Sequence, residues 1–292
     1  HPGSSGCIVG WSDMRYEEAV ASAPPGSDRF EATDLGRLDR AALHLLFTPG
    51  PATPPLTDVA AALGAEPEVE ARIADALPPE QAETLHRLGR EPRPPEERRA
   101  AARRLVRGTF WHLTYNLRPE LWDRLSQSEP LAPDLSRDLL RELVGPGIRI
   151  LEVGAGSGRL TNLLVPRAGA LVAIEPSAAL RCLLRQRLPR VSVVAGHGHR
   201  LPLASAWADL VIACGTFGPD PPMGGPVVLG EMLRCARAGG TVALVGAEQP
   251  QWWRAQGFEL VTYPPPEAHL DAELVEFFGP ARPPRHLLWR RA

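Results

Sequence analysis

The chain has 292 residues, which is enough for one large α/β domain and a second, smaller one. Its formal net charge of −2, from 34 acidic and 32 basic residues, gives no overall attraction to nucleic acid or to anionic lipid. No apolar run approaches the roughly 18–20 residues that a membrane-spanning helix needs, so we expect no membrane partner. Every basic residue is an arginine, which excludes chemistry that requires a lysine, such as a Schiff base.

The amino terminus and the cysteines favour a reducing, cytoplasmic location. Residues 1–10 have neither a basic start nor a long apolar stretch, so they do not resemble a secretory signal. The four cysteines, Cys7, Cys182, Cys214 and Cys235, form no C-x-x-C pair, which argues against a structural zinc site. Cys182, Cys214 and Cys235 lie in apolar helix or strand patterns, which predicts buried free thiols.

Residues 1–30 are predicted to be a loose segment, followed by a helical domain over residues 31–130. The spacing of apolar residues predicts helices over 35–47, 56–64, 67–77 and 78–89, and a stiff proline-rich linker over 90–95. The second and third of these helices are joined by a tight turn around Gly64. This pair is similar to the helix-turn-helix of a winged-helix domain.

The segment 96–127 is predicted to form one or two amphipathic helices with a break near Gly108. Residues 87–107 contain eight arginines and three glutamates. Two interpretations stay open: a face that binds phosphate, or a solvated helix surface with Glu–Arg pairs three or four residues apart. The predicted helix 67–77 is acidic and would repel phosphate if it were a recognition helix.

From residue 131 to residue 292 short apolar runs alternate with helical runs, which predicts buried parallel strands joined by helical crossovers. The predicted strands are 148–153, 170–175, 191–196, 209–215 and 241–246, followed by a last hairpin that reaches residue 290. The predicted helices are 134–143, 160–167, 177–187 and 227–240.

The strand 148–153 runs into a glycine-rich loop, Glu152-Val153-Gly154-Ala155-Gly156-Ser157-Gly158. Glycines permit a tight turn from strand to helix and a close approach of the backbone to a ligand. The next strand ends in Glu175, and a carboxylate at that place can accept hydrogen bonds from both hydroxyls of a ribose. A dinucleotide fingerprint requires glycine at position 159, which is arginine here, and a phosphate-binding P-loop requires a lysine.

The spacing E-x-G-x-G-x-G resembles motif I of the class I S-adenosylmethionine-dependent methyltransferases. Further matches in the same order extend the resemblance over about residues 134–246: Leu201-Pro202, Asp209, Asp220-Pro221, and a glycine pair before the fifth strand. The resemblance implies an α/β fold, a Rossmann-like sheet with helices on both faces, preceded by a mostly helical N-terminal domain. It also implies S-adenosylmethionine as the cofactor. The H-x-H pair of His197 and His199 supplies only two ligands, and no nearby Asp, Glu or Cys completes a set by spacing, so we expect no metal ion.

The resemblance implies a role for several residues. Glu152 and Gly154 would line the methionine end of the cofactor, and Glu175 would hold the ribose. His197 stands where the family usually has an aspartate that accepts from the adenine amino group, so either neutral His197 or a backbone group would do this work. The full set implied for cofactor binding is Glu152, Gly154, Ala155, Gly156, Gly158, Glu175, Pro176, His197, Gly198, Cys214 and Gly215.

The sequence gives less direct evidence for the residues that contact the methyl acceptor. His112 and Tyr115 are candidate bases, and Trp111, Phe217 and His269 are candidate contacts of the substrate. Phe217 and Gly218 stand where many small-molecule members of the family have a histidine pair. Because Trp111 and Tyr115 are one helical turn apart, we expect both to face the cofactor cleft opposite Phe217.

Three classes of function follow. The first is O- or N-methylation of a small molecule, with the helical domain used for closure over the substrate or for a homodimer. The second is RNA or protein methylation through the arginine-rich residues 87–107. The third is a non-catalytic, S-adenosylmethionine-binding regulator. The net charge and the acidic helix favour the first, so we expect a small-molecule acceptor and not nucleic acid.

Overall fold

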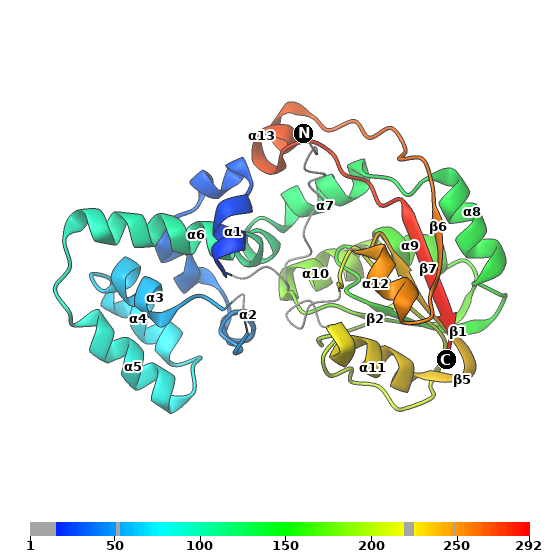
Figure 1. Ribbon diagram of the computed structural model, residues 1–292, viewed down its shortest axis with the longest axis horizontal. Helices are drawn as coiled ribbons and strands as arrows, with labels where there is room; N and C mark the ends of the chain where they lie inside the picture. The colour runs from blue at the N-terminus through cyan, green and yellow to red at the C-terminus, as the bar shows by residue number, and fades with distance from the viewer. Residues whose placement is uncertain (1–15, 51–52, 219–224, 248) are drawn as a thin grey trace. The chain divides into compact units, whose positions relative to one another are not determined.

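The computed structural model describes residues 16–50, 53–218, 225–247 and 249–292. Among the described residues there are two units (Figure 1). Of the described residues, the helical unit takes in those from Tyr16 to Trp122 together with Ala272–Gly279, and the sheet unit takes in those of Asp123–Asp271 and Pro280–Ala292. The predicted boundary at residue 130 stays a prediction. Cys7 and Asp220-Pro221, which entered the sequence argument, lie outside the described residues.

The helical unit is built from short helices, several of which begin at a proline. Proline suits the first helical turn because its fixed φ is helical and the N–H that it lacks would have no partner there. Its elements are α1 (Tyr16–Ser22), the 3-10 helices η1 (Pro25–Arg29) and η2 (Ala32–Arg37), α2 (Arg40–Leu46), α3 (Leu56–Leu63), α4 (Pro67–Ala74), α5 (Pro79–Gly89), α6 (Pro95–Leu117), the start of α7 (Pro119–Ser128), and α13 (Ala272–Phe278). Among the described residues this unit contains no strand, so they include no β wing.

Two sequence predictions for the helical unit are wrong in detail. The helix predicted over 35–47 is divided, because Asp39 Oδ1 accepts a hydrogen bond from Ala42 N at 2.7 Å and so starts α2 as a new helix. The break predicted near Gly108 is absent, and α6 continues to Leu117. Gly108 instead makes room for Tyr16, whose Cε2 would overlap with a Cβ at that position. The break falls at Arg118, since a residue before proline disfavours helical angles.

An aromatic cluster fills much of the helical unit's core. Trp111, which is 4% exposed, stacks on Phe278 with ring centroids 5.6 Å apart. It also contacts the rings of Phe110, Tyr115 and Trp122 at 5.0–5.8 Å. The contact between Trp111 and Tyr115 confirms that these two side chains share one face of α6. Because Phe278 comes from α13, these contacts explain why that distant helix groups with the helical unit.

The sheet unit contains a seven-stranded sheet with the order β3-β2-β1-β4-β5-β7-β6 (Figure 1). β7 runs antiparallel to both of its neighbours, β5 and β6, and the other strand pairs are parallel, so the parallel sheet and the closing hairpin predicted from the sequence are confirmed. The strands are β1 (Ile148–Val153), β2 (Ala168–Ile174), β3 (Ser192–Val194), β4 (Ala208–Cys214), β5 (Ala236–Val245), β6 (Glu259–Thr262) and β7 (His286–Arg291).

Helices cover both faces of this sheet, as expected. Alternate strand residues point to opposite faces, so Ile150 and Leu151 lie in different buried clusters. The Ile150 cluster contains apolar side chains of α8 (Pro133–Glu142), α9 (Arg159–Leu164) and α10 (Ala178–Arg187), and the Leu151 cluster contains those of α11 (Gly225–Cys235) and α12 (Pro250–Ala255).

Two further predictions need correction. The helix predicted over 227–240 ends at Cys235, because Ala236 already pairs with Ala208 of β4 and begins an irregular start of β5. The thiol of Cys182 is exposed, whereas Cys235 is buried and Cys214 is partly buried. All three are free thiols, as predicted.

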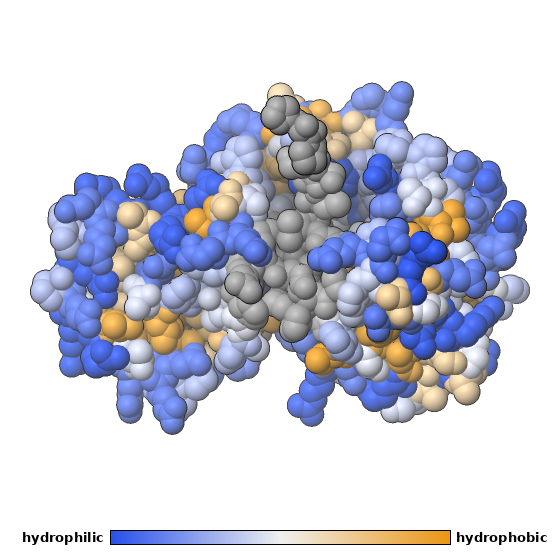
Figure 2. Space-filling view, in the orientation of Figure 1, coloured by the Kyte–Doolittle hydropathy of each residue, from blue (hydrophilic) through white to orange (hydrophobic). Residues whose placement is uncertain are grey.

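In the part of the chain that the structure describes, no helix combines the length and the apolar character needed to cross a bilayer. Large exposed apolar side chains there are Val227 on α11 and Val275 on α13. On the face in Figure 2, hydrophobic residues form small separate areas among hydrophilic ones. The cytoplasmic location and the homodimer through the helical domain stay predictions.

Candidate functional site

The glycine loop lies at the carboxyl edge of β1, where the sequence places it. Gly154, Gly156 and Gly158 all have positive φ, from +58° to +101°. The N–H groups of Gly154 and Ala155 both donate to Ile174 O, at 2.8 and 3.0 Å, which holds the loop across the end of β2. A Cβ at Gly154 would lie 2.5 Å from Cγ2 of Thr216, so the loop packs directly against the segment that follows β4. A side chain at position 154 is therefore excluded twice, by the backbone angle and by Thr216.

The other glycines of the site have different surroundings. A Cβ at Gly158 would lie 2.6 Å from Leu184 Cδ1, so this glycine lets α9 pack against α10. A Cβ at Gly215, which also has positive φ, would meet no atom within 4 Å among those described. Gly215 therefore leaves space open at the carboxyl end of β4, next to Cys214. The cofactor contacts implied for Ala155, Gly156, Gly158 and Gly215 stay predictions.

Glu175 follows β2, and both of its carboxylate oxygens accept hydrogen bonds from backbone N–H groups. Oε2 accepts from Gly156 N at 2.9 Å, and Oε1 accepts from Ser177 N at 2.8 Å. The residue is 5% exposed, and burial raises the pKa of Glu175 to about 7, against the effect of these two hydrogen bonds. Each oxygen keeps a second lone pair that can accept from a ligand hydroxyl. The carboxylate thus braces the glycine loop and remains able to bind a diol.

Glu152 is the second buried acid of the site. It is 1% exposed, and its Oε2 has no hydrogen-bond partner among the described residues. Burial raises the pKa of Glu152 to about 8; the charge of Glu175 adds to this rise, and Thr161 and Arg159 oppose it. A buried acceptor without a donor is costly, so this oxygen fits a site that receives a cationic or hydrogen-bond-donating ligand group.

Arg159 is part of this site, although in the sequence it stands out only as the arginine where a dinucleotide fingerprint has glycine. Its Nη1 donates to Glu129 O at 3.0 Å, and its Nη2 contacts Cys214 Sγ at 3.4 Å. Its position directly after the glycine loop is the sequence feature that could have marked it as a residue of the site. What it contacts was not foreseeable, because Glu129 and Cys214 come from distant parts of the chain.

The segment after β3 lies beside Phe217. A Cβ at Gly198 would be 2.7 Å from Cζ of that ring. Phe217 is 7% exposed and belongs to the cluster that contains Val228, so it is largely a core residue here. The backbone of His197 forms a bridge with Arg200. Pro176 O accepts from Arg181 Nη1 at 2.6 Å, which secures the turn after Glu175.

The remaining candidates lie elsewhere in the two units. His112, Tyr115 and Trp111 are on α6 of the helical unit, and of these Trp111 is a core residue. His269 has an 89% exposed side chain, 3.7 Å from the carboxylate of Glu267. The acceptor-directed roles of His112, Tyr115, Trp111, Phe217 and His269 stay predictions. The described residues contain no group of three or more His, Cys, Asp or Glu side chains arranged to hold a metal ion.

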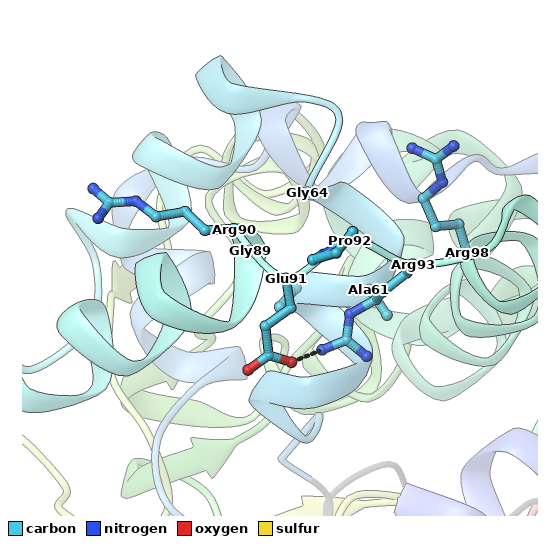
Figure 3. Close-up of a pocket in the computed structure, with 9 residues that line it drawn as sticks. Ala61, Gly64, Gly89, Arg90, Glu91, Pro92, Arg93 and Arg98 are labelled. Atoms are coloured by element: carbon cyan, nitrogen blue, oxygen red, sulfur yellow. Dashed lines mark hydrogen bonds and ion pairs between the residues drawn. The ribbon is translucent and has the colours of Figure 1, made fainter.

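The arginine-rich segment borders a hollow of about 310 Å³ in the helical unit (Figure 3). Arg93 is paired with Glu91 at 3.1 Å and with Glu97 at 2.8 Å. Arg90 and Arg98 extend to opposite sides of the hollow in Figure 3. These side chains do not converge on one point, which favours the interpretation of a solvated helix surface with Glu–Arg pairs.

Residues 150–240 match the family model described as a methyltransferase domain. An uncharacterised methyltransferase of Mycobacterium tuberculosis is 34% identical over 33% of this chain and 39% of its own length. A demethylmenaquinone methyltransferase of Beutenbergia cavernae is 32% identical over 42% of this chain and 52% of its own length. The chain thus spans about half or less of these relatives. A solved S-adenosylmethionine-dependent methyltransferase of Aquifex aeolicus aligns with a TM-score of 0.35 and 19% identity, over 42% of this chain and 71% of that one.

Proposed function

We propose that the chain, whose residues 150–240 match a methyltransferase domain, transfers a methyl group from S-adenosylmethionine to a small-molecule acceptor. The observation that carries the proposal is the arrangement of Glu152, Gly154 and Glu175 at the carboxyl edge of β1 and β2. It joins a loop with no room for a side chain at position 154 to two buried carboxylates. When bound, S-adenosylmethionine supplies a methyl group already activated on a sulfonium.

The residues of the chain bind the cofactor and orient it. Glu175 accepts hydrogen bonds from the ribose hydroxyls while it holds the N–H groups of Gly156 and Ser177. Glu152 offers its unpartnered Oε2 to the ammonium of the methionine end. Gly154 and Gly215 allow the ligand to approach the backbone at the ends of β1 and β4. Most of the catalytic effect then comes from positioning and from excluding water.

Two observations support a small-molecule acceptor over RNA. Of the arginines in the segment 87–107, Arg90 and Arg98 extend to opposite sides of the hollow in Figure 3, and Arg93 is already paired with two glutamates. The Beutenbergia cavernae relative is named for a small acceptor, demethylmenaquinone. Nucleic-acid binding usually depends on several unpaired cations that face one backbone. We therefore place small-molecule methylation first and RNA or protein methylation second.

The test supplies methyl-labelled S-adenosylmethionine to the purified protein with three separate acceptor pools: a small-molecule extract, bulk tRNA, and denatured protein. We expect label to accumulate in the small-molecule pool, and the transfer to fall in the Glu175→Ala variant. The matched control is Glu142→Ala, which removes an exposed carboxylate on α8 and should leave the transfer unchanged. Label in tRNA or protein instead would establish the second candidate, and label in no pool would favour the non-catalytic regulator.

A further inference from the structure

Two sides of the Arg159 guanidinium differ in their hydrogen bonds. Nη1 donates to backbone carbonyls, whereas the edge formed by Nε and Nη2 has no oxygen acceptor among the described residues. The side chain is 18% exposed, so most of its charge is withdrawn from water. Nη1 donates to Glu129 O at 3.0 Å and to Ser126 O at 3.5 Å. Nε, by contrast, is buried and has no hydrogen-bond partner among the described residues, and Nη2 contacts only the thiol of Cys214.

This empty edge is the one that suits a carboxylate. The N–H groups of Nε and Nη2 point in the same direction and match the two oxygens of a carboxylate as a fork. A thiol is a weak acceptor and does not satisfy a charged donor. Among the described residues, the carboxylate that forms an ion pair with Arg159 is that of Glu129, whose Oε2 lies 4.0 Å from Nη1, and Glu129 Oε1 already accepts from Arg282 N at 2.6 Å.

A second buried side chain that lacks a hydrogen-bond partner, the carboxyl of Glu152, lies near this cation. Glu152 Oε2 is buried without a partner. Glu152 pairs with Ile212 in the β1–β4 register, two residues before Cys214, whose thiol Arg159 contacts at 3.4 Å. An α-amino acid carries an ammonium and a carboxylate on one carbon. An acid and a guanidinium that lie close together, each with an open hydrogen-bonding position, complement such a zwitterion.

We infer that Arg159 binds the carboxylate of the cofactor's methionine end through Nε and Nη2, while Glu152 receives the ammonium. This rests on the proposed function, because it assigns the group that fills the open edge of Arg159. The competing explanation is structural: Arg159 would only fasten the turn at Ser126–Glu129 through Nη1. The two explanations differ in whether the effect of Arg159 depends on the ligand's amino-acid group.

The experiment compares two ligands by isothermal titration calorimetry. S-adenosylhomocysteine carries the amino-acid end, and 5′-methylthioadenosine has the same adenosine and sulfur without it. In Arg159→Gln we expect S-adenosylhomocysteine to bind about 10- to 100-fold more weakly, the loss typical of a hydrogen-bonded charge pair. Binding of 5′-methylthioadenosine should equal that of the wild type, which also shows that the variant is folded. Arg159→Lys, which keeps the charge but loses the fork, should fall between the wild type and Arg159→Gln.

The matched control is Arg167→Gln, because Arg167 also follows the glycine loop and also donates to a backbone carbonyl, Leu140 O at 3.3 Å. It should leave both ligands unaffected. Unchanged S-adenosylhomocysteine binding in Arg159→Gln would overturn the inference and leave the proposed function standing. An equal loss for both ligands would show that Arg159 only braces the site. If the wild type binds neither ligand, the proposed function and the inference fail together.

Discussion

Replacing Glu175 by alanine is expected to weaken the binding of S-adenosylhomocysteine by about 2–3 kcal/mol, roughly 30- to 150-fold. The variant loses the acceptor for the ribose hydroxyls. It also releases the N–H groups of Gly156 and Ser177, which the carboxylate holds at 2.9 and 2.8 Å, and so loosens the glycine loop. Calorimetric titration of the variant beside the wild type measures the loss.

Two further variants separate these contributions. Glu175→Gln keeps one acceptor oxygen and nearly the same shape, so its affinity should lie between those of the wild type and Glu175→Ala. Glu142→Ala removes an exposed carboxylate on α8 and should bind as the wild type does. Unchanged affinity in Glu175→Ala would show that Glu175 does not bind the ribose.

The ligand-free protein is expected to lose about 3–5 kcal/mol of unfolding free energy between pH 5 and pH 8.5. Burial raises the pKa of Glu152 from 4.5 to about 8 and that of Glu175 to about 7. In this range the folded protein holds protons that the unfolded chain has released. The stability from these protonated acids is therefore fully present below pH 4.5 and is lost as the pH rises through the folded-state pKa values.

Urea unfolding at a series of pH values measures this slope. Glu152→Gln mimics the protonated acid, so its stability should vary much less with pH than that of the wild type. Carboxylates whose pKa is lowered, such as Asp209, which accepts a hydrogen bond from Arg149 N and pairs with Arg237, lose their contribution only at lower pH and do not mask the effect. Stability that rises from pH 5 to pH 8.5, or an equal slope in Glu152→Gln, would contradict this account.

Much of the sheet unit could be predicted because its signals are local. The apolar run at 148–153, followed at once by Gly154, Gly156 and Gly158, fixes a strand, a tight turn and a helix in order. The carboxyl ends of parallel strands meet at one edge, so Glu175 had to lie near that loop. The structure confirms both placements.

The features that were not predicted depend on contacts between distant segments. Gly108 suggests a helix break on its own, yet it lies within α6 because Tyr16 fills the space beside it. Arg159 appears in the sequence as a departure from a glycine fingerprint. Its open edge becomes visible only when Glu129 and Cys214 are brought beside it. Helical spacing alone places Trp111 on a face but does not supply Phe278, its stacking partner from α13.

The central claim is that the loop Gly154–Gly158 and Glu175 form a site for S-adenosylmethionine, and one titration tests it most directly. The wild-type protein is titrated by calorimetry with S-adenosylhomocysteine and, separately, with NAD. We expect saturable 1:1 binding of S-adenosylhomocysteine with a micromolar Kd and no saturable heat with NAD, because Arg159 occupies the position where a dinucleotide fingerprint has glycine. Binding of NAD with comparable affinity, or no binding of S-adenosylhomocysteine, would contradict the claim.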